Sequence, residues 1–158
     1  MQVRAVRSDE LDRLKDVRLR ALRDDPGAFG SRYEDEAGRD PSLWLRWVTG
    51  GSTFVAEDGA WHGLVAVYLD GDDASLCHLG AMWVDPRQRG RGLGHRLLDA
   101  GIGWAREAGA TSIRLGVVDG NAAASRAYRG AGFEPTGERE PLRSDPTKSV
   151  VFMARPLD

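Results

Sequence analysis

The sequence predicts an α+β domain in which helices pack against a single, mostly antiparallel sheet. The chain has 158 residues, a length typical of one domain with a sizeable core, so we treat residues 1–158 as a single domain. Three strand patterns between residues 53 and 84 are separated only by short turns, which predicts an antiparallel meander. A further strand pattern, residues 112–117, follows a helical segment, so we expect it to run parallel to its predecessor.

The N-terminal part of the chain is mainly helical. Val3 to Val6 predicts a short strand. Apolar residues then recur at three-to-four spacing, which indicates an amphipathic helix that ends at Asp24 to Gly27. Residues 28–36 read as irregular or only briefly helical. Pro41 to Val48 predicts a second helix, with the proline in its first turn.

Strand patterns dominate from Thr53 onwards. Residues 53–57 and 61–69 are joined by the hairpin signal Asp58-Gly59, and residues 74–84 complete the meander. The later elements that we expect are a helix from Gly92 to about Ala108, the parallel strand, a short helix from Ala122 to Ala131, and two closing strands near 134–139 and 149–155 with a loop at 140–147 between them.

Charge and composition exclude several classes of function. The net charge is −2, so no overall basic field favours nucleic acid. The single cysteine, Cys77, cannot form an intramolecular disulfide, which fits a reducing cytoplasm. The N-terminus lacks an apolar signal core, and no stretch approaches the roughly 20 apolar residues of a membrane span. We therefore expect a cytoplasmic protein without a nucleic-acid or membrane partner, either as a monomer or as a homodimer.

The stretch Val84 to Gly94 alternates glycines with arginines between a predicted strand and a predicted helix. Glycine permits positive φ and lets the backbone approach a ligand closely. A helix that begins here directs its unpaired N–H groups at the loop. The spacing matches neither the P-loop nor the dinucleotide-binding fingerprint. The pattern predicts an anion-binding loop, and a surface turn rich in glycine and arginine is the alternative.

Two motifs resemble those of the GNAT superfamily of acetyl-CoA-dependent N-acetyltransferases. The first is R-x-x-G-x-G at Arg87, Gly90 and Gly92. The second is N-x-x-A-x-x-x-Y-x-x-x-G-F, which extends from Asn121 to Phe133. They occur in the order that the family shows, and the resemblance covers nearly the whole chain. It implies a sheet with a splayed parallel pair at its centre, flanked by about four helices.

The resemblance also implies a binding site for acetyl-CoA, and no metal ion is expected. Backbone amides of the loop would hold the pyrophosphate. Amides near Met82 and Val84 would bind the pantetheine arm, and one of them could polarise the thioester carbonyl. The residues implied in cofactor binding are Met82, Trp83, Val84, Arg87, Gln88, Arg89, Gly90, Arg91, Gly92, Leu93, Gly94, Asn121, Ser125 and Tyr128.

Tyr128 is the candidate for the acid that protonates the departing thiolate. A thiol titrates near ~8.5 and a phenol near ~10, so the phenol can donate a proton to the sulfur. Asn121, Ser125 and Tyr128 are spaced i, i+4, i+7 and share one helical face. Asn121 is expected first as the helix N-cap and second as a ligand. The alternative for Tyr128 is a packed aromatic side chain.

The base that accepts the proton of the amine has two candidates. Period-2 alternation places His78 on one strand face with Gly80, Met82 and Val84, unless a bulge intervenes. A histidine near ~6.5 could serve as the base, or it could simply be exposed at a strand end. Glu34, from a loop that lines the acceptor site in the family, is the second candidate, and its alternative is a solvated surface acid.

Four residues are candidates for binding the acceptor amine. They are Phe29, Tyr33, Glu34 and Trp44, and the alternative for the tryptophan is core packing. Cys77 should point away from His78, because neighbouring strand residues face opposite sides. We therefore interpret Cys77 as a core residue and expect no acetyl-enzyme.

The sequence thus predicts an N-acetyltransferase that moves an acetyl group from acetyl-CoA to a primary amine of a small molecule. Direct attack through a tetrahedral intermediate is the expected route. One rival is a protein acetyltransferase that acts on an N-terminus or a lysine. A rival from another class is a catalytically silent acyl-CoA-binding module. Loss of the motif tyrosine would have suggested such a module, but Tyr128 is present.

Overall fold

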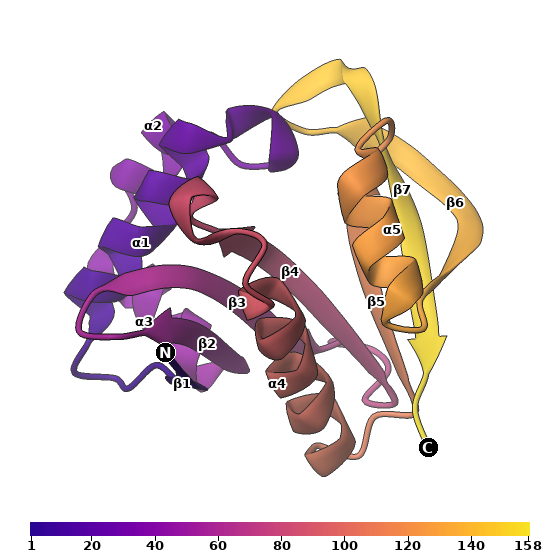
Figure 1. Cartoon of the computed structure of the whole chain (residues 1–158), viewed down its shortest axis with the longest axis horizontal. Helices are drawn as coiled ribbons and strands as arrows, with labels where there is room; N and C mark the ends of the chain where they lie inside the picture. The colour runs from indigo at the N-terminus through magenta and orange to yellow at the C-terminus, as the bar shows by residue number, and fades with distance from the viewer.

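The computed structural model describes residues 1–158 as an α+β fold built on one sheet. Figure 1 shows the sheet opening towards the top, with α4 and α5 on either side of the gap. The elements in chain order are β1 (Gln2–Ala5), α1 (Leu11–Asp24), η1 (Pro26–Ala28), α2 (Tyr33–Ala37), α3 (Pro41–Thr49), β2 (Ser52–Glu57), β3 (Trp61–Leu69), β4 (Leu76–Val84), η2 (Pro86–Gln88), α4 (Leu93–Glu107), β5 (Ser112–Val118), α5 (Ala122–Gly130), β6 (Glu134–Leu142) and β7 (Asp145–Pro156).

The sheet has seven strands in the order β1-β2-β3-β4-β5-β7-β6. Each neighbouring pair is antiparallel except β4 and β5, which are parallel and are joined through α4. The predicted fold class is therefore confirmed, including the parallel pair at the centre of the sheet. No helix combines the length and the apolar character needed to cross a membrane.

The parallel pair is hydrogen-bonded at one end only. Leu76 to His78 pairs with Ser112 to Arg114, and no register continues beyond these residues. From there β4 stays paired to β3, whereas β5 pairs with β7 along its whole length. The two strands therefore diverge and leave a wedge-shaped gap in the sheet, which Figure 1 shows between the labels β4 and β5.

A bulge in β4 changes which side chains share a face of the sheet. The register with β3 shifts between Leu64 and Ala66, opposite Ala81, whose φ of 57° is the one positive value among the non-glycine residues. Cys77 therefore faces the same core as Met82, whereas unbroken alternation would place them on opposite faces. The bulge is the exception that the prediction allowed for, and His78 does not share a face with Met82 and Val84.

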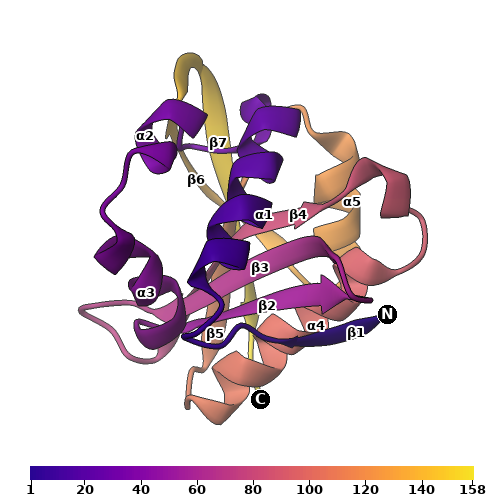
Figure 2. The ribbon, with the colours of Figure 1, turned by 90° about the vertical axis from the view of Figure 1, so that its left-hand side faces the viewer.

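Two apolar cores lie on opposite faces of the sheet. The larger contains the buried face of α4, with Leu97, Leu98 and Ile102, and it includes Cys77 as the sequence predicted. The smaller joins α1 and α3 to β2, β3 and Trp83. Figure 2 shows α1 lying across the strands on the side away from α4. Helices on both faces therefore hold β4 rigidly next to the gap.

The C-terminal hairpin differs from the sequence-based prediction. Residues 140–147 were expected to form a loop, but β6 extends to Leu142 and β7 begins at Asp145. That segment is rich in Pro, Ser and Asp, which suggested irregular backbone; however, β6 is the edge strand, where the N–H that Pro141 lacks costs no ladder hydrogen bond. The short helix α2 also gives regular structure to part of residues 28–36.

Candidate functional site

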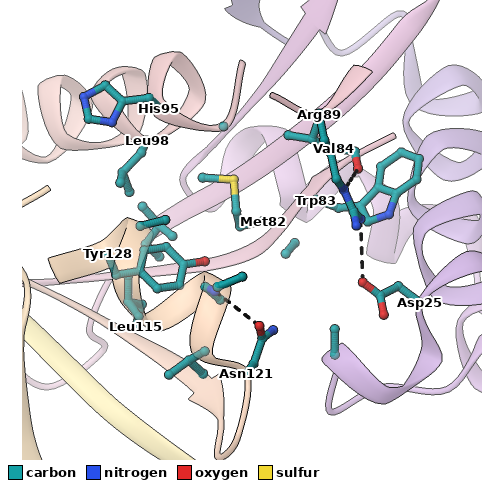
Figure 3. A pocket seen from close by; sticks show the side chains of 18 of the residues that line it. Asp25, Met82, Trp83, Val84, Arg89, His95, Leu98, Leu115, Asn121 and Tyr128 are labelled. Carbon is teal, nitrogen blue, oxygen red and sulfur yellow. Dashed lines mark hydrogen bonds and ion pairs between the residues drawn. The ribbon is translucent and has the colours of Figure 1, made fainter. Parts of the chain in front are cut away.

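A cavity of about 500 Å³ occupies the gap between the diverging strands. It extends from the loop before α4, past β4 and β5, to the inner face of α5, and Figure 3 shows the side chains around it. The predicted cofactor residues that line it are Met82, Trp83, Val84, Gln88, Arg89, Gly90, Gly92, Leu93, Gly94, Asn121 and Tyr128.

The segment between β4 and α4, called the glycine loop below, is anchored by Asp85. This buried carboxylate accepts a hydrogen bond from the backbone N–H of Arg87 at 3.0 Å, and it pairs with the guanidinium groups of Arg87 at 3.0 Å and Arg20 at 2.7 Å. The hydrogen bonds from Arg87 hold the pKa of Asp85 at about 2, below its usual range. The loop is therefore tied to α1 and remains paired throughout the neutral pH range.

The loop backbone is shaped to receive an anion. Gly90 and Gly92 both have φ of 80°, and Gly92 precedes the first turn of α4. No protein acceptor takes the backbone N–H groups from Gly90 to His95, whereas the N–H of Arg96 already bonds to the carbonyl of Gly92 at 3.1 Å. A Cβ added at either glycine would meet no protein atom within 4 Å. These free amides at a helix N-terminus fit a phosphate group.

The arginines of the loop do not all face the cavity. Arg89 lines it, donates to the carbonyl of Val84 at 2.9 Å and lies 3.7 Å from the Asp25 carboxylate, as Figure 3 shows. Arg87 is turned to Asp85, and Arg91 donates to the side chain of Gln88 at 3.1 Å. Neither of these two lines the cavity, so the backbone supplies more of the anion site than the arginines do.

Helix α5 brings two of its three predicted side chains, Asn121 and Tyr128, to the cavity. The side chain of Asn121 accepts a hydrogen bond from the N–H of Ala124 at 3.2 Å, so it is the N-cap that the sequence predicted. Ser125 does not line the cavity. Tyr128 does, and Figure 3 shows its hydroxyl directed into it.

The ring of Tyr128 packs edge-on against Phe133 with a centroid distance of 6.1 Å. Burial disfavours the charged phenolate and raises the pKa of Tyr128 to about 12. The hydroxyl is therefore protonated throughout the physiological range, and it is available as a hydrogen-bond donor to a group in the cavity.

A second cavity of about 250 Å³ adjoins the first on the side of β6. Phe29, Gly80, Ala81, Gly116 and Val118 line both cavities, so the two adjoin at the gap in the sheet, and we refer to them together as the passage. The second cavity adds polar side chains that the first lacks, namely Arg18, Ser31, Glu140 and Arg143.

The predicted acceptor-binding residues are only partly brought together. Phe29 lines both cavities. Tyr33 and Glu34 lie on α2 and line another surface pocket, which shares Ser31 with the second cavity but is lined by neither Phe29 nor Tyr128. Trp44 is buried in the smaller core and stacks on Trp47 at a centroid distance of 5.6 Å, which corresponds to the core-packing alternative.

His78 lies outside both cavities. It sits where β4 and β5 are still paired, opposite Tyr68 on β3, and its ring nitrogen is 2.8 Å from the carboxylate of Asp70. The gap begins beyond this position, so the histidine and Tyr128 belong to different parts of the sheet. Cys77, next to it, is fully buried, and burial raises the pKa of its thiol to about 11, which makes it a poor nucleophile.

Sequence reasoning missed several residues of the passage. Leu115, Gly116 and Val117 of β5 line the first cavity, and so does His95 in the first turn of α4. The strand pattern of β5 gave no sign of which residues lack a partner on β4. Arg18 and Glu140, which line the second cavity, lie on α1 and β6, and no motif marked them.

Comparison with known proteins identifies the family of this site. The model of the acetyltransferase (GNAT) family matches residues 16–133. Mycothiol acetyltransferase of Beutenbergia cavernae is 35% identical over 103 residues, which cover 65% of this chain and 32% of that protein. The mycothiol acetyltransferase of Thermobispora bispora is 32% identical over 122 residues, 74% of this chain and 40% of that protein. The chain thus matches only about a third to two fifths of these relatives' length.

Solved structures show the same fold. The acetyltransferase yncA of Salmonella typhimurium, solved with acetyl-CoA, has a TM-score of 0.79 at 21% identity and covers 100% of this chain and 94% of its own. A GNAT acetyltransferase of Streptococcus pneumoniae has a TM-score of 0.80 at 20% identity, with 99% of both chains covered. At such identities the likeness concerns the fold.

Proposed function

The chain belongs to the GNAT family of acetyltransferases, and we propose that it transfers an acetyl group from acetyl-CoA to the primary amine of a small molecule by direct attack. One observation carries this proposal. A passage through the sheet joins an anion-binding loop to a second polar cavity, and a protonated tyrosine hydroxyl points into it. Such a passage lets a donor and an acceptor meet from opposite ends.

The residues of the first cavity fit acetyl-CoA, the cofactor of the family. The free N–H groups from Gly90 to His95 would bind its pyrophosphate, and the positive φ of Gly90 and Gly92 gives the backbone this close approach. The unpaired edge of β4 beyond His78 offers backbone groups to an extended arm in the gap. When bound, acetyl-CoA supplies a thioester whose carbonyl carbon can be attacked by an amine.

Tyr128 would donate a hydrogen bond to the sulfur that leaves. Its pKa near 12 makes the phenol a weaker acid than usual, because burial disfavours the phenolate. We therefore expect it to stabilise the developing thiolate as a donor in a site with little water, an electrostatic role of the kind that oxyanion holes play.

Glu140 is the carboxylate that we propose as the base, because it is the acidic residue in the lining of the second cavity. Neither Glu34 nor His78 lines this passage, although the pocket that holds Glu34 shares Ser31 with the second cavity. Glu34 and His78 remain the two candidates for the base that the sequence suggested. Either of them could accept the proton of the amine only through a bridging water molecule.

A panel of amines tests the proposed function. Release of free coenzyme A thiol from acetyl-CoA is followed with polyamines, amino acids, aminoglycosides, thiol-containing amines and peptides, and each product is identified by its mass. Turnover of at least one small amine above the hydrolysis rate is expected. Tight binding of acetyl-CoA without turnover would favour a silent acyl-CoA-binding module, and turnover of peptides alone would favour a protein acetyltransferase.

A further inference from the structure

Arg18 is a buried charge at the wall of the second cavity. It lies on α1 with 5% of its surface exposed, and it lines the cavity together with Phe29, over whose ring its guanidinium carbon lies at 4.8 Å. Trp47 is stacked within 5.3 Å of the same guanidinium. Aromatic rings on an arginine orient the planar group and leave only its edge free for hydrogen bonds.

Half of that edge is already used. Glu36 accepts hydrogen bonds from Nε and Nη2 of Arg18, both at 3.0 Å, and this carboxylate has 1% of its side chain exposed. The remaining nitrogen, Nη1, is buried and has no hydrogen-bond partner in the protein. Native structures seldom leave a buried charged donor unpaired, so each such atom calls for a missing partner. Nη1 carries two N–H groups, which suit an oxygen anion.

The charge around Arg18 is not balanced by Glu36. Arg39 also reaches Glu36, at 3.8 Å, so one carboxylate serves two arginines. Arg143, which lines the same cavity, forms no ion pair within 4.0 Å. The wall therefore has a positive excess, and Glu140 is the negative group of the lining. A molecule with an amine at one end and an anion at the other would complement this arrangement.

We propose that the acceptor amine also carries a carboxylate, and that Nη1 of Arg18 binds it in the second cavity. The inference rests on the proposed function and specifies its substrate class: amino-carboxylic acids rather than plain amines. A carboxylate suits the site because it is planar and small enough for a cavity of about 250 Å³. Arg18 is in this view a positioning residue, which orients the acceptor so that its nitrogen faces the gap.

Matched pairs of acceptors test the substrate class on the unmodified protein. Each pair is an amino acid and the amine left when its carboxylate is removed, for example phenylalanine and phenethylamine, or methionine and 3-(methylthio)propylamine. A charge-assisted hydrogen bond predicts a kcat/KM about 10- to 100-fold higher for the amino acid. The amide of the same amino acid should behave like the plain amine. Equal kcat/KM values for both members of every pair would overturn the proposal.

Two variants separate binding from structure. Arg18→Gln alone would leave the carboxylate of Glu36 buried with less compensation, so the main variant is the double replacement Arg18→Gln with Glu36→Gln. It should raise the KM of the amino acids about 10- to 100-fold and leave the plain amines within a few-fold of the parent. Glu36→Gln alone retains Arg18 and should keep the preference. Arg13→Gln, which removes an arginine stacked on Trp61 at 4.5 Å from the same helix, is the matched control.

The readouts distinguish the possible failures. Calorimetric affinity for acetyl-CoA and the thermal midpoint show whether each variant folds. A folded double variant that loses both members of each pair equally would indicate a structural role for Arg18 and would overturn the proposal.

If no amine is acetylated, the proposed function fails, and binding of N-acetylphenylalanine to the protein saturated with coenzyme A decides the inference. If the parent protein binds N-acetylphenylalanine and the double variant does not, the carboxylate site is supported. If the parent does not bind it, the proposal is overturned.

Discussion

Gly90 and Gly92 set the chemistry of the loop through their backbone. Both adopt a φ of 80°, which side chains disfavour, and both line the cavity at the N-terminus of α4, where successive N–H groups have no protein acceptor. Because these donors are backbone groups, the arginines around them can be engaged elsewhere: Arg87 with Asp85 and Arg91 with Gln88.

Gly92→Val should weaken acetyl-CoA binding at least tenfold, because its Cβ and methyl groups would enter the open space in which we propose that the pyrophosphate binds. Isothermal calorimetry measures the dissociation constant. Gly59→Val is the matched control, since Gly59 also has a positive φ and open space around it but lies in the β2–β3 hairpin. Similar affinities for the two variants would show that the loop does not hold the cofactor.

Tyr128→Phe should lower kcat roughly 10²- to 10³-fold and change the affinity for acetyl-CoA by no more than a few-fold. It removes one hydrogen-bond donor, and the packing of the ring against Phe133 is retained. The loss should shrink with an acyl donor whose thiol is more acidic. Tyr68→Phe, at an exposed position on β3, is the control. Full activity of Tyr128→Phe would show that the hydroxyl of Tyr128 is not needed and that the residue serves only in packing.

Glu140→Gln should lower kcat/KM about 10²-fold and abolish the acidic limb of the pH–rate profile, if this carboxylate accepts the proton of the amine. Glu34→Gln and His78→Gln test the two other candidates in the same assay. A pH profile that changes in one of these variants, and not in Glu140→Gln, would move the role of base to that residue.

Strand β4 contributes to both cores because a bulge interrupts it in its middle. Its first residues pair with β5 and point Cys77 into the larger core, whereas beyond Ala81 the faces are exchanged and Trp83 packs into the smaller one. The bulge thus lets a single strand contribute side chains to both cores, three residues after its pairing with β5 ends at His78.

Ala81→Gly should leave the free energy of unfolding unchanged or raise it by up to ~1 kcal/mol, since glycine adopts the φ of 57° without strain. Ala66→Gly, on β3 in the pair with Gly80 next to the register shift, has no positive φ to relieve and should instead lower it by about 0.5–1 kcal/mol. Urea unfolding measures both. A larger loss for Ala81→Gly than for Ala66→Gly would argue against the bulge conformation.

The molecule as a whole is held by carboxylates that pair with arginines across elements. Arg4 of β1 holds Glu10 at 2.7 Å and Glu57 of β2 at 2.9 Å, and Asp85 joins the glycine loop to α1. The hydrogen bonds from Arg4 lower the pKa of Glu10 to about 2, as those from Arg87 do for Asp85. Two of these ion pairs, Arg4–Glu57 and Arg20–Asp85, connect segments that are distant in the sequence.

Stability should therefore fall in acid. A carboxylate with a lowered folded-state pKa binds protons more readily in the unfolded chain, so its contribution is complete above about pH 5 and is lost as the pH falls from there towards 2. Urea midpoints measured at pH 7, 5 and 3 should show little change between the first two and a clear drop at the third. The urea midpoint should depend less on pH in Glu10→Gln. An equal drop in that variant would show that Glu10 does not contribute to the loss of stability in acid.

The sequence predicted the elements and the loop because both depend on local order. The strand from Trp61 to Leu69 has the predicted bounds, and α4 begins within one residue of the predicted position. Periodicity, caps and glycine spacing act over a few neighbouring residues, so they can be read without knowing the rest of the fold. The two motifs also predicted that Tyr128 and the glycine loop contribute to one site, and both line the same cavity.

The wall of the second cavity depends on contacts between distant segments. Arg18 on α1 and Glu140 on β6 line one cavity only because the gap between β4 and β5 opens between the part of the sheet that packs against α1 and the part that ends in β7 and β6. His78 is separated from the gap because pairing of β4 with β5 persists up to that residue, and the bulge at Ala81 then exchanges the faces. Pairing length and register result from packing of the whole sheet, and alternation along one strand carries no information about them.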